Sequence, residues 1–138
     1  MRDALDLRLT NDLAELPRLA RAVDEFCGRH GLAPAIAFAF NLALEEAITN
    51  VIAHGYADAA AHEIRVRMRV ADATVTAEVI DDGRPFDPLQ VERPDLTGGI
   101  EDRRLGGLGI FLMRRSMDEV RYRTVGRHNC LELSKRIA

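Results

Sequence analysis

The stretch NLALEEAITNVIAHGY, residues 41–56, combines an apolar helical pattern with a line of polar side chains. Glu46, Asn50 and His54 are spaced four residues apart, so on a helix they stack along one face. Glu45 is rotated about 100° away and cannot share that line. The line is either a narrow solvated stripe on an exposed helix or the polar wall of a site.

The flanking sequence places this stretch in the second of two helices. Pro34 opens the helix at a position where a missing N–H has no cost, and Gly55 is suited to end it. An earlier helix carries apolar side chains at helical spacing over residues 13–27. Pro17 lies within that pattern, so its first turn is expected to be separate or kinked, and Gly31 ends the helix.

Alternating apolar residues predict strands on both sides of the helices. Residues 5–9 form a short first strand, and a closing hairpin spans residues 119–137. Residues 63–70 (EIRVRMRV) and 74–80 (TVTAEVI) each place apolar side chains on one face, which predicts an antiparallel pair. The other face carries a row that we interpret as solvated: Arg65, Arg67 and Arg69.

Hairpins, rather than regular strand–helix alternation, indicate an α/β fold of the α+β type. We expect a two-layer sandwich with helices on one face of a mixed, largely antiparallel sheet. The 138 residues are 47% hydrophobic and 30% charged, a balance that fits one globular domain over residues 1–138.

Composition also excludes several classes of function. The net charge is -3 and the arginines are scattered, so nucleic acid is not an expected partner. We expect no apolar run long enough to span a bilayer and find no signal-peptide core, which predicts a cytoplasmic protein without a membrane contact. Cys27 and Cys130 fit no metal-ligand spacing and are interpreted as small buried hydrophobic residues.

A second motif, DDGRPFDP, covers residues 81–88 at the end of a predicted strand. It is either a tight turn or a carboxylate followed by a glycine that lets a planar ligand approach the backbone. The spacing of its acidic residues excludes an EF-hand loop. The polar segment that follows, to about residue 104, has no periodicity and is either a functional lid or a disordered insert.

A third motif, GGLGI, covers residues 106–110 and opens a helix. Such turns expose backbone amides and the positive end of the helix dipole to an anion. The Rossmann fingerprint would need a glycine where Leu112 stands, and no Gly-Lys-Ser/Thr run of a Walker A loop exists. A phosphate bound here would therefore belong to neither of these two nucleotide folds.

In this order and context, the three motifs resemble the N, G1 and G2 boxes of the GHKL ATPases, whose nucleotide-binding domain has the Bergerat, or histidine-kinase-like, fold. The chain is most similar to the stand-alone branch, the anti-sigma-factor serine kinases of RsbW type. The resemblance covers nearly the whole chain, and residues 88–105 match the position of the ATP lid.

The resemblance implies a role for each matching residue. Glu46 would be the general base, and Asn50 would coordinate the Mg²⁺ that bridges the ATP phosphates. Asp81 would accept a hydrogen bond from the adenine amino group, with Gly83 beside the ring. The phosphates would be held by the glycine turn and the end of the lid: Arg104, Gly107, Leu108 and Gly109.

Three side chains near these motifs are assigned less specifically. Arg103, like Arg104, would either close onto the γ-phosphate or belong to a solvated lid surface. Arg84 in the second motif stays undecided. His54 is interpreted as structural, at the helix end, because no catalytic step requires it.

The resemblance implies an ATP-binding serine/threonine kinase in a partner-switching pathway. It would use ATP and Mg²⁺ to phosphorylate a serine of an antagonist (anti-anti-sigma) protein, and it would also bind a sigma factor. The resemblance also implies a homodimer. The alternative is a nucleotide-binding regulatory module that controls its partner by binding alone.

Overall fold

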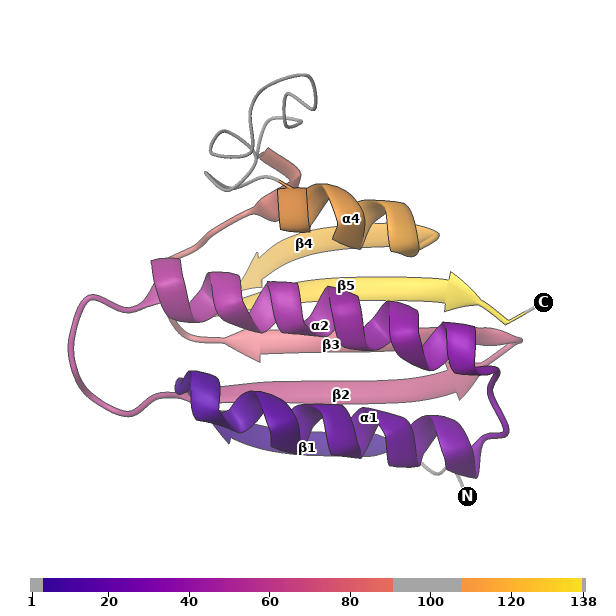
Figure 1. Cartoon of the computed structure of the whole chain (residues 1–138). Helices are drawn as coiled ribbons and strands as arrows, with labels where there is room; N and C mark the ends of the chain where they lie inside the picture. Colours follow the sequence, from indigo (N-terminus) through magenta and orange to yellow (C-terminus); the bar gives the residue numbers. More distant parts are fainter. Residues whose placement is uncertain (1–3, 91–107, 138) are drawn as a thin grey trace.

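The computed structural model describes residues 4–90 and 108–137, which form a five-stranded sheet with helices on one face (Figure 1). The strand order is β1-β2-β3-β5-β4, and each neighbouring pair of this sheet is antiparallel. The predicted α+β sandwich on a largely antiparallel sheet is confirmed. The strands are β1 Leu5–Thr10, β2 Glu63–Ala71, β3 Thr74–Asp81, β4 Glu119–Val125 and β5 His128–Arg136.

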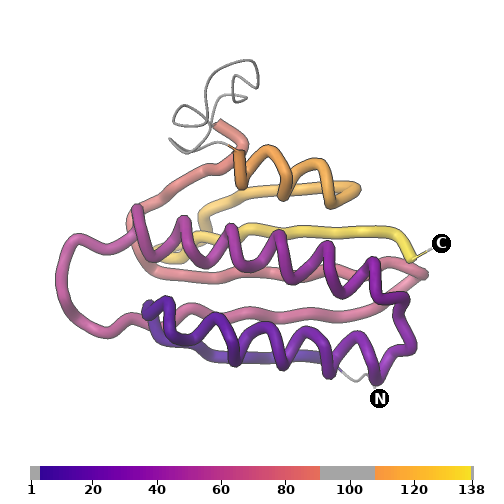
Figure 2. Tube along the Cα trace, in the orientation of Figure 1, coloured from indigo at the N-terminus to yellow at the C-terminus, as the bar shows by residue number. Residues whose placement is uncertain are grey.

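The helices form one layer over the sheet. Helix α1 packs on β1 and against α2, while α2 covers β3 and β5 and contacts α4 (Figure 2). The α-helices are α1 Leu16–Arg29, α2 Pro34–Gly55 and α4 Leu108–Ser116, and the short 3-10 helices are η1 Leu13–Glu15 and η2 Pro88–Gln90. The separate first turn predicted around Pro17 is confirmed, because η1 precedes α1. Gly31 follows α1 with a φ of 63°, a conformation that suits glycine.

The β2–β3 hairpin has the predicted pairing and faces. Asp72 and Ala73 form its two-residue turn with φ values of 53° and 59°, as in a type I′ turn. The apolar residues of β2 lie under the helices, whereas its arginines face away from them. Arg65 pairs with Asp6 at 2.6 Å, so the arginine row is a solvated face with ion pairs.

Helix α2 is more apolar than the sequence analysis expected. Within the described residues, Pro34–Gly55 is the one helix with the length and hydropathy of a membrane span, with a mean hydropathy of 1.4. The expectation that no run would be long enough was therefore wrong. The helix is this apolar because much of it is buried. It supplies a large part of the core between the helices and the sheet, with Phe40, Leu44 and Ile48 fully buried.

The register of the central strands brings polar groups to one end of the core. Val75, Ala77 and Val79 face the helices, and Asp81 continues this row at the end of β3. Asn129 on β5 is its paired residue. These two are the buried polar side chains of the described structure, so the helix-covered face ends in a polar pair.

Candidate nucleotide-binding site

The polar line on α2 is a hydrogen-bonded pair. Asn50 Nδ2 donates to Glu46 Oε2 over 3.1 Å, which fixes the orientation of the amide. The Asn50 Oδ1 atom is therefore the end of the amide that is not turned toward the carboxylate, and it keeps its capacity to ligate a hard cation. Glu45 is exposed, as its rotation away from the line predicts.

Helix α4 begins beside this pair, with Gly109 directly against Glu46. A Cβ at Gly109 would collide with the carboxylate of Glu46. The glycine thus leaves the Glu46 carboxylate in place against the first turn of α4, which starts at the half-buried Leu108. Backbone N–H groups of a first helical turn lack partners within the helix, so Glu46 and Asn50 lie next to a set of amide donors.

The lid and the first glycines of the third motif lie outside the described residues. This holds for Arg103, Arg104 and Gly107, and for the predicted lid beyond Gln90. The roles that the resemblance gives these residues stay predictions. Arg84 is exposed, and its backbone N–H rather than its side chain makes the contact described below.

Asp81 is held at the inner end of β3. Its Oδ2 atom accepts hydrogen bonds from the backbone N–H of Gly83 at 2.8 Å and from Asn129 Nδ2 at 3.0 Å. Burial raises the pKa of this carboxyl group, and the hydrogen bond from Asn129 opposes the shift. Its Oδ1 atom accepts no hydrogen bond from a described residue, and no buried polar side-chain atom of the described part lacks a partner. Solvent therefore reaches Oδ1.

Gly83 makes a backbone contact that the sequence did not predict. The Arg84 N–H donates to the Gly55 carbonyl over 2.7 Å, and a Cβ on Gly83 would lie 2.7 Å from that same oxygen. The missing side chain is thus required for packing against the end of α2. The turn after β3 and the helix that carries Glu46 are joined at this point, and the predicted role of Gly83 beside a planar ligand stays a prediction.

A narrow pocket lies between these elements. Asn50 and Asp81 are polar groups in its lining, and the other walls include Val79, Met113 and Leu131. Apolar walls with a few convergent polar groups suit a planar base. The cavity has room for roughly one water molecule, so a purine requires the lining side chains to move.

His54 lies at the rim, where it stacks on Phe86. The ring centroids are 4.3 Å apart and the planes differ by 8°. Phe86 lines the pocket, whereas His54 packs on Phe86 without lining the pocket itself. This contact supports the structural interpretation of His54, because the imidazole packs at the helix end and does not join the Glu46–Asn50 pair.

Two residues of the site were missed by sequence reasoning. Asn129 bonds Asp81, and Tyr122 on β4 lines the pocket and bonds Asn129. A signal in the sequence could have identified Asn129. It precedes Leu131 and Leu133 at a spacing of two, so it is the polar first residue of the inward-facing row of β5. Tyr122 has a similar signal, because it follows Val120 at a spacing of two on the half-buried face of β4.

The structure is therefore an α+β domain with a carboxylate–amide pair on α2 beside the first turn of α4. The sequence profile of the Histidine kinase-like ATPase domain matches residues 9–135. The chain belongs to this family, which the resemblance to GHKL ATPases predicted.

The chain is similar to named kinases and anti-sigma factors. It is 29% identical over 101 residues to "Serine/threonine-protein kinase BtrW" of Bordetella bronchiseptica, covering 73% of this chain and 71% of that one. It is 30% identical over 141 residues to an "Anti-sigma F factor" of Caldanaerobacter subterraneus, covering 92% and 95%. It is 34% identical over 85 residues to "Serine-protein kinase RsbW" of Bacillus subtilis, covering 58% and 52%.

Solved structures agree on the fold. The RsbU and RsbW domains of Rv1364c from Mycobacterium tuberculosis superpose with a TM-score of 0.72 at 19% identity, over 98% of this chain and 32% of that chain. The blue-light activated histidine kinase of Erythrobacter litoralis superposes with a TM-score of 0.57 at 20% identity, over 91% of this chain and 60% of that chain.

Several of the related anti-sigma F factors are matched by this chain over only about half of their own length, for example 53%.

Proposed function

We propose that this protein is an ATP-dependent protein serine kinase that acts as an anti-sigma regulatory factor. The observation that carries the proposal is the Glu46–Asn50 pair on α2, placed against the start of α4 at Gly109. Membership of the family implies ATP as the nucleotide, and the names of the relatives support a protein serine as the acceptor. Residues 1–138 form a single ATP-binding domain in this proposal.

The nucleotide would be bound between the G1 turn and the start of α4. The free Oδ1 atom of Asp81 is an acceptor for the amino group of a base in the pocket. Gly83 would lie beside the base. The triphosphate would extend toward the backbone amides of the third motif and the end of the lid: Arg104, Gly107, Leu108 and Gly109.

Asn50 is the proposed protein ligand of Mg²⁺. The residue fits such an ion because Glu46 engages Nδ2 and leaves the amide oxygen for ligation. When bound, Mg²⁺ would neutralise negative charge on the phosphates.

Glu46 is the proposed general base. It would accept the proton of a serine hydroxyl while the serine oxygen forms a bond to the γ-phosphorus. The bond between that phosphorus and the β–γ bridging oxygen breaks, and ADP leaves with the electron pair. The position of Glu46 beside the amides of α4 would hold the attacking group and the phosphate in one place.

The partner is proposed from the same relatives. The acceptor would be a serine of an antagonist protein, and a sigma factor would be a second partner, bound when the antagonist is phosphorylated. A homodimer and a cytoplasmic location complete the proposal.

A transfer assay tests the kinase. Radiolabelled γ-phosphate from ATP is followed onto a candidate antagonist protein, with Glu46→Gln as the test variant and the exposed neighbour Glu45→Gln as its control. We expect Glu46→Gln to lower the rate by about 10²–10⁴-fold and Glu45→Gln to stay within about twofold of wild type. Equal rates for both variants would remove Glu46 from the mechanism. Calorimetry that finds Mg-ATP binding with no transfer would leave the non-catalytic regulatory module.

A further inference from the structure

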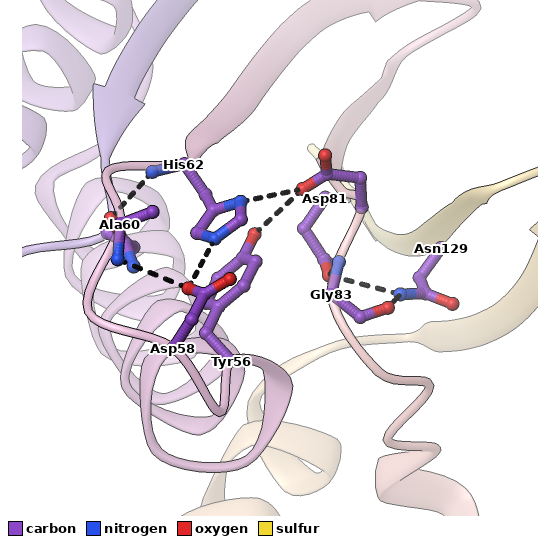
Figure 3. A network of polar contacts seen from close by, with 9 residues as sticks. Tyr56, Asp58, Ala60, His62, Asp81, Gly83 and Asn129 are labelled. Atoms are coloured by element: carbon purple, nitrogen blue, oxygen red, sulfur yellow. Dashed lines mark hydrogen bonds and ion pairs between the residues drawn. The ribbon is translucent and has the colours of Figure 1, made fainter.

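The amide of Asn129 joins β5 to the end of β3 and the G1 turn, as Figure 3 shows for Gly83. A further hydrogen bond, from Tyr122, links it to β4. Its Nδ2 atom donates to Asp81 Oδ2 at 3.0 Å and to the carbonyl of Gly83 at 2.9 Å. Its Oδ1 atom accepts the hydroxyl of Tyr122 at 3.2 Å. The side chain is only 5% exposed.

This arrangement permits one orientation of the amide. Both groups facing Nδ2 are acceptors, and an amide oxygen turned toward them would meet two other oxygens. The Tyr122 hydroxyl donates from the other side and holds the oxygen there. Asn129 therefore presents its two N–H groups to the strand end and the turn.

The orientation of Asp81 follows from that of Asn129. Both donors to the Asp81 carboxylate, the Gly83 N–H and Asn129 Nδ2, bond the same oxygen, Oδ2. Asp81 also lines the pocket, and Oδ1 is the carboxylate oxygen left for a ligand there. An ionised carboxylate oxygen is only an acceptor, so it favours a base that offers an amino group and disfavours one that offers a carbonyl oxygen.

We propose that Asn129, held by Tyr122, is the positioning residue that makes the site select a 6-amino purine over a 6-oxo purine. The proposal rests on the proposed function, in which the pocket takes the base of a nucleoside triphosphate. Without the Asn129 amide, only the Gly83 N–H would hold Asp81, and the carboxylate could rotate toward solvent and away from the base.

The paired ligands for the test are ATP and inosine triphosphate, which differ at the 6-position of the purine and in the N1–H that the 6-oxo base carries. Dissociation constants for both, with Mg²⁺, are measured for the wild type and for Asn129→Leu, Tyr122→Phe and Asn41→Leu. The last variant is the control, because Asn41 Nδ2 donates to Asp24 Oδ1 at the same 3.0 Å but on the surface between α1 and α2.

We expect the wild type to prefer ATP, and Asn129→Leu to reduce that preference by about tenfold or more by weakening ATP binding selectively. Tyr122→Phe keeps the ring and removes the hydroxyl, so the preference should fall by a few-fold. Asn41→Leu should leave it unchanged. If Asn129→Leu does not fold by circular dichroism, Tyr122→Phe decides the result.

If Asn129 has only a structural role, Asn129→Leu weakens the binding of both nucleotides by the same factor and leaves the preference for ATP unchanged. That result overturns the proposal. Equal affinity of the wild type for the two nucleotides overturns it as well. Neither result affects the kinase assignment, provided that phosphate transfer from ATP is observed. A wild type that binds no ATP contradicts both the positioning role and the proposed function.

Discussion

Asp81 and Asp82 are neighbours in sequence but lie on opposite sides of the strand end. Asp81 is 6% exposed and faces the pocket under the helices, where two N–H groups fix its carboxylate. The side chain of Asp82 is 49% exposed and faces the loop that follows α2. Because successive side chains of a strand point to opposite faces, a single step along the chain separates a candidate ligand group from a surface group.

The surface side has its own polar cluster. Tyr56 donates to Asp82 Oδ1 at 3.3 Å and stacks on His62 with centroids 4.2 Å apart. His62 Nε2 contacts Asp58 at 2.8 Å, and its other ring nitrogen lies 3.8 Å from Asp82. Figure 3 shows both sides of the turn, with Asn129 and Gly83 on one and Tyr56, Asp58 and His62 on the other. The shortest contact is 2.8 Å in both clusters, so it is their environment, buried or exposed, that separates them.

The largest effect should come from Asp81→Asn, which changes the buried side alone. The asparagine oxygen can accept the same two N–H groups, so its NH₂ group would occupy the position of Oδ1 and face the amino group of adenine. Two opposed donors should weaken ATP binding by about 100-fold or more. Titration calorimetry with Mg-ATP measures this loss. Unchanged affinity would mean that Asp81 does not contact the base.

The next effect comes from Gly83→Ala, which acts on the backbone between the two clusters. The new Cβ would lie 2.7 Å from the Gly55 carbonyl oxygen, and a backbone atom cannot move away as a flexible side chain can. We expect a loss of about 1–3 kcal/mol in the free energy of unfolding, measured by urea denaturation. Gly28→Ala on α1 is the control, since a Cβ there meets no atom within 4 Å. Equal effects of the two substitutions would contradict the close contact.

A third prediction concerns stability and pH. Burial raises the pKa of Asp81 above its ordinary value of 3.8, so folding above that raised pKa has to bury a charge. The carboxyl group therefore favours the folded state most below 3.8, and this contribution is lost as the pH rises through the folded-state pKa.

The Asp81→Asn variant should consequently be more stable than the wild type at neutral pH, although it binds ATP more weakly. The difference in the free energy of unfolding should shrink as the pH falls through the raised pKa and disappear below 3.8. Urea unfolding of both proteins between pH 7 and 3.5, in the absence of nucleotide, measures it. A deficit of the variant that is constant with pH would contradict burial as the cause.

Much of this arrangement could be predicted from local periodicity. The alternation in residues 63–80 predicted the β2–β3 pair, and continuing it by two residues places Asp81 on the inner face. The four-residue spacing of Glu46 and Asn50 predicted their contact on α2. These features depend on residues that are close in sequence, and a helix or strand period is enough to fix them.

The remainder depends on pairings that no local pattern contains. Asn129 lies 48 residues after Asp81, and their contact requires the register of β3 with β5. The approach of Gly83 to Gly55 likewise depends on how the end of α2 meets the turn after β3. The polar loop after residue 90 has no period from which contacts could be derived. Sequence reasoning therefore singled out Asp81, the proposed ligand carboxylate, but not Asn129, the amide that bonds it.

The smallest effect should come from Asp82→Asn, the same chemical change made one residue further on. Asparagine keeps an oxygen for the Tyr56 hydroxyl, and the contact of His62 with Asp82 lies at 3.8 Å on a solvated surface, where ion pairs contribute about 0–1 kcal/mol. We expect a change in unfolding free energy below about 0.5 kcal/mol and Mg-ATP affinity within about twofold of wild type. Both are measured beside Asp81→Asn under identical conditions. A loss of ATP binding that matches that of Asp81→Asn would show that the surface cluster belongs to the site, and the separation by strand face would then be wrong.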